Sequence, residues 1–217
     1  MTPIQAQLDL LKSDITAMWT LVVSQLHKSL HSVKTFDKDF SREVVSNEKR
    51  VNSMELNIDR NCENLFALFN PVAIDLRFVL ATLKINNNLE RIGDIAEGIS
   101  KLIISEKQAF DPELLKVTQF IEMYEAAINI VQDVLNAFDQ ENTKLARSIF
   151  IKDEMLDDIN AAVNGVITAY IRENPDKTEQ ALNVLSIIRK LERVGDQSKN
   201  IAEEIIFYLE SKVLKHN

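Results

Sequence analysis

Two apolar stripes with the same spacing occur 102 positions apart in the chain. Steps of three and four residues place such side chains along one face of an α-helix. The pattern therefore predicts long amphipathic helices, each turning one stripe toward the core of a bundle. The two stripes consist of Ile85, Leu89, Ile92, Ala96, Ile99 and Ile103, and of Ile187, Leu191, Val194, Ser198, Ile201 and Ile205.

The four prolines mark expected helix starts. Each follows a residue that can cap a helix, namely Thr2, Asn70, Asp111 or Asn174, which is typical of an N-cap followed by the first helical residue. The similar segments FDKDFS and FDQENT suggest two further starts. Helices are thus predicted over residues 3–34, 38–69, 71–107, 112–137, 142–173 and 175–214. Most would be roughly 45 to 60 Å long.

The repeated stripes divide these six helices into two units of three. Only four glycines and four prolines occur in 217 residues, which favours a helical protein over one built on sheets. We expect an all-α fold of two tandem three-helix bundles, with one domain over residues 1–110 and a second over 111–217. A sheet of three or more strands would contradict this expectation.

Charge and composition exclude several classes of function. A formal net charge of -8 without a Lys/Arg run disfavours binding to duplex nucleic acid. The longest stretches without charged residues, 15–27 and 159–171, are too short and too polar to span a bilayer, so contact with a membrane would need a partner protein. The single Cys62 cannot form an internal disulfide, and no secretory signal pattern is evident, so a cytoplasmic protein is expected.

The hexapeptide LERIGD at 89–94 returns as LERVGD at 191–196. Glu90 and Asp94 lie one helical turn apart, as do Glu192 and Asp196, and both pairs are expected to face away from the apolar stripe. Two carboxylates at this spacing repel each other but can hold one divalent cation or bridge several. An exposed, solvated helix face is the alternative.

A second polar stripe runs along the preceding helix of each half. Each of these helices carries an acid at i and an oxygen ligand at i+4. Because consecutive helices are antiparallel neighbours, the two helices of each half could bring these pairs together. Such all-oxygen donor sets suit hard cations and iron. The stripes are Glu48, Asn52, Glu55 and Asp59 in the first half, and Asp153, Asp157, Asn160 and Asn164 in the second.

The remaining residues of the hexapeptide leave alternatives open. Glycine within a helix costs about 1 kcal/mol relative to alanine. Gly93 and Gly195 therefore indicate either a group that approaches the backbone or a close helix crossing. Arg91 and Arg193 are expected to form salt bridges with the aspartate three residues on, although a guanidinium could also meet an anionic ligand.

The segments NPVAIDLRFVLATLKINNNLERIGDIAEGI and IIRKLERVGDQSKNIAEEI resemble the two repeats of the PhoU family, the regulatory proteins of bacterial phosphate uptake. The recurrence of the hexapeptide and the Pro-x-x-x-Asp-Leu-Arg segment at 71–77 carry the resemblance, which covers nearly the whole chain. It implies two three-helix bundles related by pseudo-twofold symmetry and a multinuclear metal cluster in each. Iron is favoured, while zinc, manganese, magnesium and nickel stay open.

The resemblance also implies which residues hold the metal. The implied pairs are Glu48 with Asn52, Glu90 with Asp94, Asp153 with Asp157, and Glu192 with Asp196. Asn52 departs from the acidic pattern, because its amide offers an oxygen without a charge. We therefore expect weaker binding in the first bundle than in the second, unless Glu55 or Asp59 contributes.

The family's role implies a regulator and no enzyme. The resemblance implies a cytoplasmic negative regulator that links a phosphate ABC transporter, through the ATPase subunit of that transporter, to a sensor histidine kinase. It also suggests a homodimer. A helical adaptor without functional metal is one alternative. A carboxylate-metal enzyme is another, which is disfavoured because no histidine stands three residues after a candidate glutamate.

Overall fold

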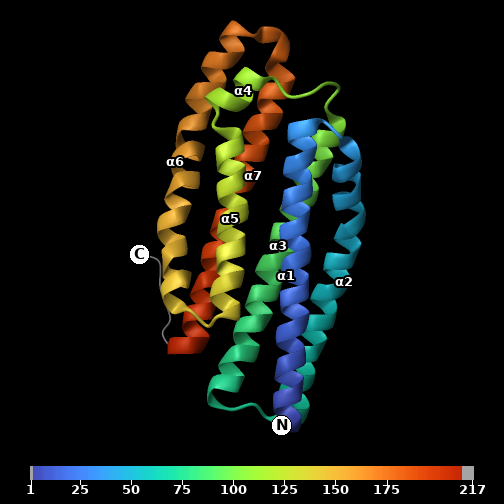
Figure 1. Ribbon diagram of the computed structural model, residues 1–217, viewed down its shortest axis with the longest axis vertical. Helices are drawn as coiled ribbons and strands as arrows, with labels where there is room; N and C mark the ends of the chain where they lie inside the picture. Colours follow the sequence, from blue (N-terminus) through green and yellow to red (C-terminus); the bar gives the residue numbers. More distant parts are fainter. Residues whose placement is uncertain (1, 212–217) are drawn as a thin grey trace.

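The computed structural model describes residues 2–211, which form helices joined by short loops (Figure 1). The expectation of an all-α protein is confirmed, and no β-strand occurs among these residues. Within them, no helix combines the length and the apolar character needed to cross a membrane. The helices are α1 (Pro3–Thr35), α2 (Lys38–Phe69), α3 (Ala73–Ser105), α4 (Pro112–Val117), α5 (Phe120–Asp139), α6 (Thr143–Glu173), the 3₁₀ turn η1 (Pro175–Lys177) and α7 (Thr178–Glu210).

Two of the four prolines begin an α-helix as predicted. The Thr2 hydroxyl accepts a hydrogen bond from the Gln5 backbone N–H at 3.4 Å, at the start of α1. At the start of α4, the Asp111 carboxylate accepts from the N–H groups of Glu113 and Leu114 at 2.8 and 3.2 Å. These bonds satisfy backbone donors that a helix start otherwise leaves without partners.

The predicted starts at the other two prolines are wrong. Asn70 adopts a left-handed conformation with φ of 46° and caps the end of α2, and α3 begins only at Ala73. Asn174 ends α6, and Pro175 opens the turn η1 before α7 starts. Asparagine tolerates the left-handed region better than most residues, so Asn-Pro can end a helix as well as begin one.

The single helix predicted over 112–137 is interrupted at Thr118 and Gln119. The Thr118 hydroxyl donates to the Leu114 carbonyl at 2.7 Å, and Gln119 takes a φ of 51° before α5 begins. A side-chain bond of this kind competes with the backbone ladder and here accompanies the end of α4. The last helix was predicted to reach residue 214, and residues 212–214 lie outside the described part of the chain.

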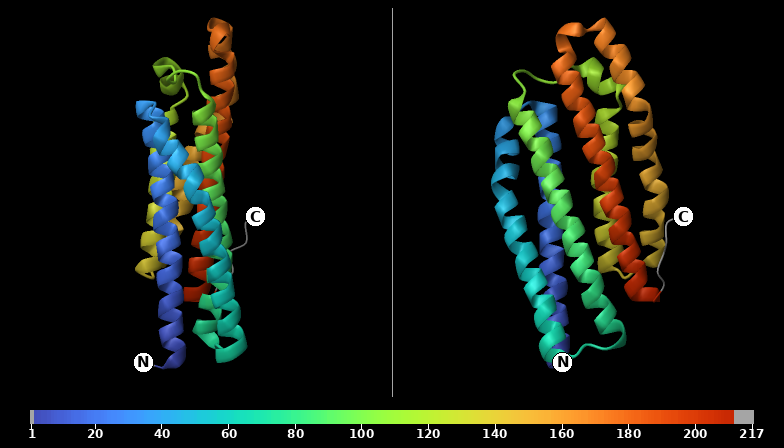
Figure 2. Two further views of the ribbon diagram at one scale, coloured as in Figure 1. Left: turned by 90° about the vertical axis from the view of Figure 1, so that its right-hand side faces the viewer. Right: turned by 180° about the vertical axis from the view of Figure 1, so that it is seen from behind.

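The helices form two bundles that lie side by side. Helices α1, α2 and α3 contact one another, as do α5, α6 and α7, and the bundles meet through α3 with α7 and α1 with α5. Figure 2 shows α3 and α7 antiparallel at the centre of the rear view, with α2 and α6 at the outer edges. The predicted pair of three-helix bundles is confirmed, while the domain boundary between 110 and 111 stays a prediction.

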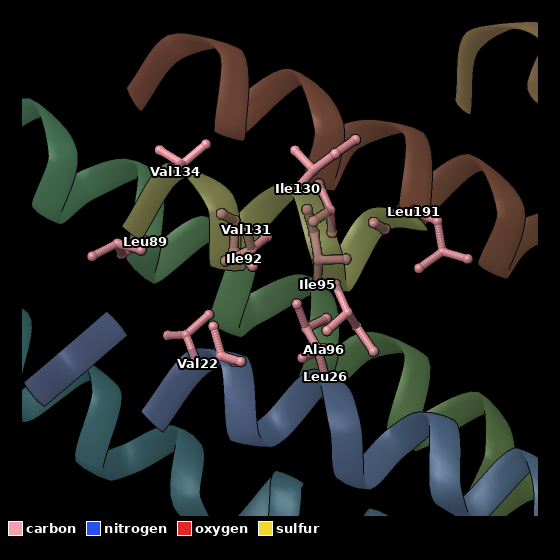
Figure 3. Packing of buried hydrophobic residues seen from close by; sticks show 14 of the residues in the cluster. Val22, Leu26, Leu89, Ile92, Ile95, Ala96, Ile130, Val131, Val134 and Leu191 are labelled. Carbon is pink, nitrogen blue, oxygen red and sulfur yellow. The ribbon is translucent and has the colours of Figure 1, made fainter. Parts of the chain in front are cut away.

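One hydrophobic core runs through both bundles without a break. Figure 3 shows side chains of α1, α3, α5 and α7 meeting there, among them Val22, Ile92, Val131 and Leu191. Trp19 of α1 is fully buried, and its Nε1 donates a hydrogen bond to the Val131 carbonyl at 3.1 Å. The shared core fixes the two motif helices, α3 and α7, relative to each other.

Trp19 offers a test of this shared core. The Trp19→Phe variant should keep the ring contact with Phe138, whose centroid lies 5.7 Å away, but lose the hydrogen bond to α5. We expect it to lower the free energy of unfolding by about 2 kcal/mol through the lost bond and a small cavity. Urea unfolding should be followed by circular dichroism, because the variant has no tryptophan. Unchanged stability would show that the Trp19 bond adds nothing.

The α3–α7 interface explains one difference between the repeats. Asn200 of α7 donates from Nδ2 to Oδ1 of Asn88 on α3 at 3.4 Å. At the pseudo-symmetric position, Gly98 of α3 faces Lys190 of α7, whose Nζ would lie 3.1 Å from a Cβ on that glycine. The absence of a side chain at Gly98 therefore leaves room for Lys190, whereas at the corresponding position in the other half Asn200 forms a hydrogen bond with Asn88.

Candidate metal centres

In the first bundle, the side chain of Glu48 crosses from α2 to the backbone of α3. Glu48 is only 4% exposed, although it belongs to a polar stripe. A Cβ added at Gly93 would lie 3.3 Å from Glu48 Oε2 and 3.1 Å from Val51 Cγ1. Two side chains of the neighbouring helix, one aliphatic and one a carboxylate, thus approach this glycine.

Glu48 is buried among other acids. Neither of its oxygens has a hydrogen bond of normal geometry in the described part of the chain. Burial, followed by the charges of Asp94, Glu97 and Glu90, raises the pKa of Glu48 to about 7, while the Gln25 side chain on α1 acts in the opposite direction. No cation is among these neighbours, so an ionised Glu48 has no compensating charge in the structure.

Glu55 and Glu90 complete this group. Burial and then the charges of Asp59 and Asp94 raise the pKa of Glu55, and burial and then Asp94 and Glu55 raise the pKa of Glu90. We call Glu48, Glu55, Glu90, Asp94 and Glu97 the first cluster. Asn52 is exposed, and the Asp59 carboxylate accepts a hydrogen bond from Asn86 at 2.9 Å. Of the two substitutes suggested for the missing charge at Asn52, Glu55 is the one whose charge contributes to the raised pKa of the motif acid Glu90.

In the second bundle, Asp153 takes the place of Glu48. Asp153 is 1% exposed, and a Cβ added at Gly195 would lie only 1.9 Å from its Oδ1. Lys199 of α7 forms an ion pair with Asp153 and a second with Asp196 Oδ1, at 2.9 Å, and its Nζ lies 3.9 Å from Asp157 Oδ2. We call Asp153, Asp157, Glu192 and Asp196 the second cluster; Lys199 lies at its centre.

The lysine changes the electrostatics of the second cluster. Burial raises the pKa of Asp153, and the ion pair with Lys199 opposes that rise. Burial alone would lower the pKa of Lys199, but its bonds to Asp153 and Asp196 raise it above the ordinary value. The ammonium therefore stays charged near neutral pH and neutralises part of the cluster.

The sequence expectations about these acids are incomplete in two respects. The motif acids were expected to face away from the apolar stripe, which holds for the exposed Asp94, whereas Glu48 and Asp153 of the second polar stripe are buried. Sequence reasoning also missed Glu97 and Lys199, which occupy the same position in the two repeats, three residues after the motif aspartate. When the two repeats are aligned on their hexapeptides, the negatively charged Glu97 of the first repeat stands opposite the positively charged Lys199 of the second.

The salt bridges expected from the motif arginines are not formed. Within residues 2–211, neither Arg91 nor Arg193 has a carboxylate oxygen within 4.0 Å of its guanidinium. Together with Lys190 they line a groove between α3 and α7, which Asp94 and Glu97 also border. The arginines are thus placed at the junction of the bundles, beside the first cluster.

The donor set fits a hard cation better in the first bundle than in the second. Carboxylate oxygens are suitable ligands in both. In the described residues, no three Asp, Glu, His or Cys side chains converge closely enough to hold a metal ion as they stand. Loading the first cluster would therefore require its partly exposed members, such as Glu90, to change rotamer toward the buried Glu48. In the second cluster, the Lys199 ammonium already lies between the carboxylates.

These features define a helical repeat protein with one buried carboxylate against a motif glycine in each three-helix bundle. A family profile described as "PhoU domain" matches residues 15–103 and again 120–205. The chain belongs to the PhoU family.

Individual relatives agree over the full length. The chain is 31% identical to "Phosphate-specific transport system accessory protein PhoU homolog 1" of Thermotoga maritima, over 97% of this chain and 90% of that protein. It is 29% identical to the PhoU protein of Escherichia coli, over 97% and 87%. The crystal structure of PhoU from Pseudomonas aeruginosa has a TM-score of 0.87 at 28% identity, covering 96% of this chain and 99% of that one.

Proposed function

We propose that this protein is a cytoplasmic, metal-binding negative regulator of phosphate uptake. In this proposal it couples the ATPase subunit of a phosphate ABC transporter to a sensor histidine kinase, and phosphate-starvation genes stay off while phosphate is plentiful. It acts by binding, as a homodimer, and turns over no substrate.

Membership of the family, with two matched domains and the full-length relatives named as accessory proteins of the phosphate-specific transport system, carries the regulatory part of this proposal. The site residues are compatible with a binding role, because the two clusters consist of carboxylates, with one lysine among those of the second.

The metal part rests on Glu48, a buried carboxylate whose charged neighbours in the described part of the chain are acids. A divalent cation held by Glu48, Glu90 and Asp94 would supply the missing positive charge. Since Glu48 belongs to α2 and the other two to α3, such a cation would tie these helices together. Metal occupancy would then control how firmly α2 packs on α3, which offers a partner a surface that responds to metal.

Deleting the gene should raise the transcripts of phosphate-starvation genes in phosphate-rich medium. Wild-type protein supplied from a plasmid should restore repression, and a Glu90→Gln, Asp94→Asn double variant should restore it less well if metal matters. Full restoration by the double variant would retain the regulatory role but remove the metal from it. Unchanged transcripts in the deletion strain would refute the regulatory role itself.

A further inference from the structure

We propose that Lys199 acts as a permanent counter-cation that closes the second cluster to metal, so that each chain holds metal only in its first bundle. This inference rests on the proposed metal-binding function. It reverses the expectation from the number of carboxylates, which was that the second bundle binds metal more tightly than the first. The ammonium of Lys199 pairs with Asp153 and Asp196 and lies 3.9 Å from Asp157, three of the four acids of that cluster.

The lysine is well held in this position. Its side chain is only 19% exposed, and Asp153, its partner on α6, is 1% exposed. A metal ion entering the second cluster would have to displace the ammonium from two ion pairs and leave it unpaired in a partly buried place. Removing one partner of a buried ion pair is strongly destabilising in general, because the other charge is left uncompensated. The four carboxylates of the second cluster therefore attract a metal cation less strongly than their number implies, because Lys199 already neutralises part of their charge.

The first cluster carries the opposite charge at the same position. Glu97 stands where the second repeat has Lys199, and its charge is among those that raise the pKa of Glu48. Lys101 pairs with Glu97 one turn further along α3, at 2.6 Å, on the exposed side of the helix. Glu48 itself is left without a cation, and Glu55 adds a carboxylate that the second repeat replaces with Asn160. The repeats have thus diverged: the buried carboxylate of the first cluster, Glu48, has no cation beside it among the described residues, whereas that of the second, Asp153, is paired with Lys199.

The test is metal uptake by purified full-length protein, with manganese(II) as the probe. Chelator-treated protein is dialysed against Mn²⁺, and bound metal per chain is measured by elemental analysis, with thermal unfolding as a second readout. Wild type and Asp196→Asn should bind the same amount, whereas Asp94→Asn should lose most of it. Lys199→Glu, which reproduces the charge of Glu97, should bind about twice as much as wild type because a second cluster becomes available.

Two further variants protect the test against misfolding and against changes in net charge. Lys199→Gln removes the ammonium without adding an acid and should also gain metal at the second cluster. Lys144→Glu makes the same change of charge at an exposed position in the first turn of α6 and should leave uptake unchanged. The metal gained by Lys199→Glu should disappear when Asp196→Asn is added, and its thermal midpoint should rise with Mn²⁺ more than that of wild type.

The outcomes separate this inference from the function on which it rests. Loss of about half the bound metal in Asp196→Asn would show that the second cluster loads despite Lys199, and would overturn the inference while retaining metal binding. Equal uptake by wild type, Lys199→Glu and Lys199→Gln would overturn it as well. Uptake by none of these proteins would refute the metal-binding function itself.

Discussion

Metal-free wild-type protein should lose stability as the pH rises from about 4.5 to about 7, and the Glu48→Gln variant should lose much less. The pKa of Glu48 is raised from 4.5 to about 7, so within this window the folded protein binds one proton more than the unfolded chain does. Stability then falls with rising pH, because the unfolded state releases the proton first. The penalty is absent below pH 4.5 and complete above pH 7.

A shift of this size corresponds to about 3 kcal/mol at pH 8. Glutamine resembles the protonated carboxyl in size and carries no charge, so the variant should match wild type near pH 4.5 and exceed its free energy of unfolding by about that amount at pH 8. Urea unfolding in the presence of chelator, at intervals of half a pH unit, measures the difference. Other acids with raised pKa values, such as Glu192, contribute to both proteins and largely cancel in the comparison.

Glu63→Gln provides the control, because Glu63 is exposed on the same helix. Its difference from wild type should stay within about 0.5 kcal/mol at every pH. If Glu48→Gln and wild type also differ by a constant amount from pH 4.5 to 8, Glu48 does not titrate in this window. The buried carboxylate would then have a compensating partner.

The sequence was sufficient for the fold because the fold is encoded within single helices. Apolar residues at steps of three and four mark the buried face of each helix. The capping residues Thr2 and Asp111 indicate where α1 and α4 begin. The two wrong helix starts both fall at Asn-Pro, although only Asn70 is left-handed, since Asn174 has φ of -132°. Asn-Pro is compatible with either end of a helix, and the left-handed conformation of Asn70 depends on where α2 stops packing.

The candidate site depends on contacts between helices, which single-helix patterns do not encode. Within its own helix, Glu48 belongs to a polar stripe, and this pattern alone predicts an exposed residue. It is buried because Gly93, on a different helix, leaves room for its carboxylate. The position of Lys199 follows similarly from the antiparallel packing of α6 on α7, which brings Asp153 to it.

The two motif glycines nevertheless gave a useful signal. A glycine in a buried helix indicates that some group approaches the backbone, and the repetition at 93 and 195 indicates the same group in both halves. In both halves the structure shows two side chains of the preceding helix at the glycine, the acid Glu48 or Asp153 and the aliphatic residue three positions further on.

Gly195→Ala should destabilise the protein by about 2 to 4 kcal/mol, although alanine is the better helix former by about 1 kcal/mol. The new Cβ would lie 1.9 Å from Asp153 Oδ1 and 3.0 Å from Leu156 Cδ2, so the buried carboxylate must move. Movement weakens its ion pair with Lys199 and leaves a buried charge without its counter-ion. The midpoint and slope of urea unfolding measure the loss.

Gly165 provides the matched control, since it lies exposed on α6 and nothing is within 4 Å of a Cβ placed there. Gly165→Ala should raise the free energy of unfolding by about 0.5 to 1 kcal/mol. Combining Gly195→Ala with Asp153→Ala should cost less than the sum of the two single changes, because the second creates the space that the first requires. Strict additivity would mean that the cost of Gly195→Ala does not arise from its contact with Asp153. A Gly195→Ala variant as stable as Gly165→Ala would mean that Asp153 can leave this glycine at no cost, and the fixed position of Lys199 among the acids would lose its structural basis.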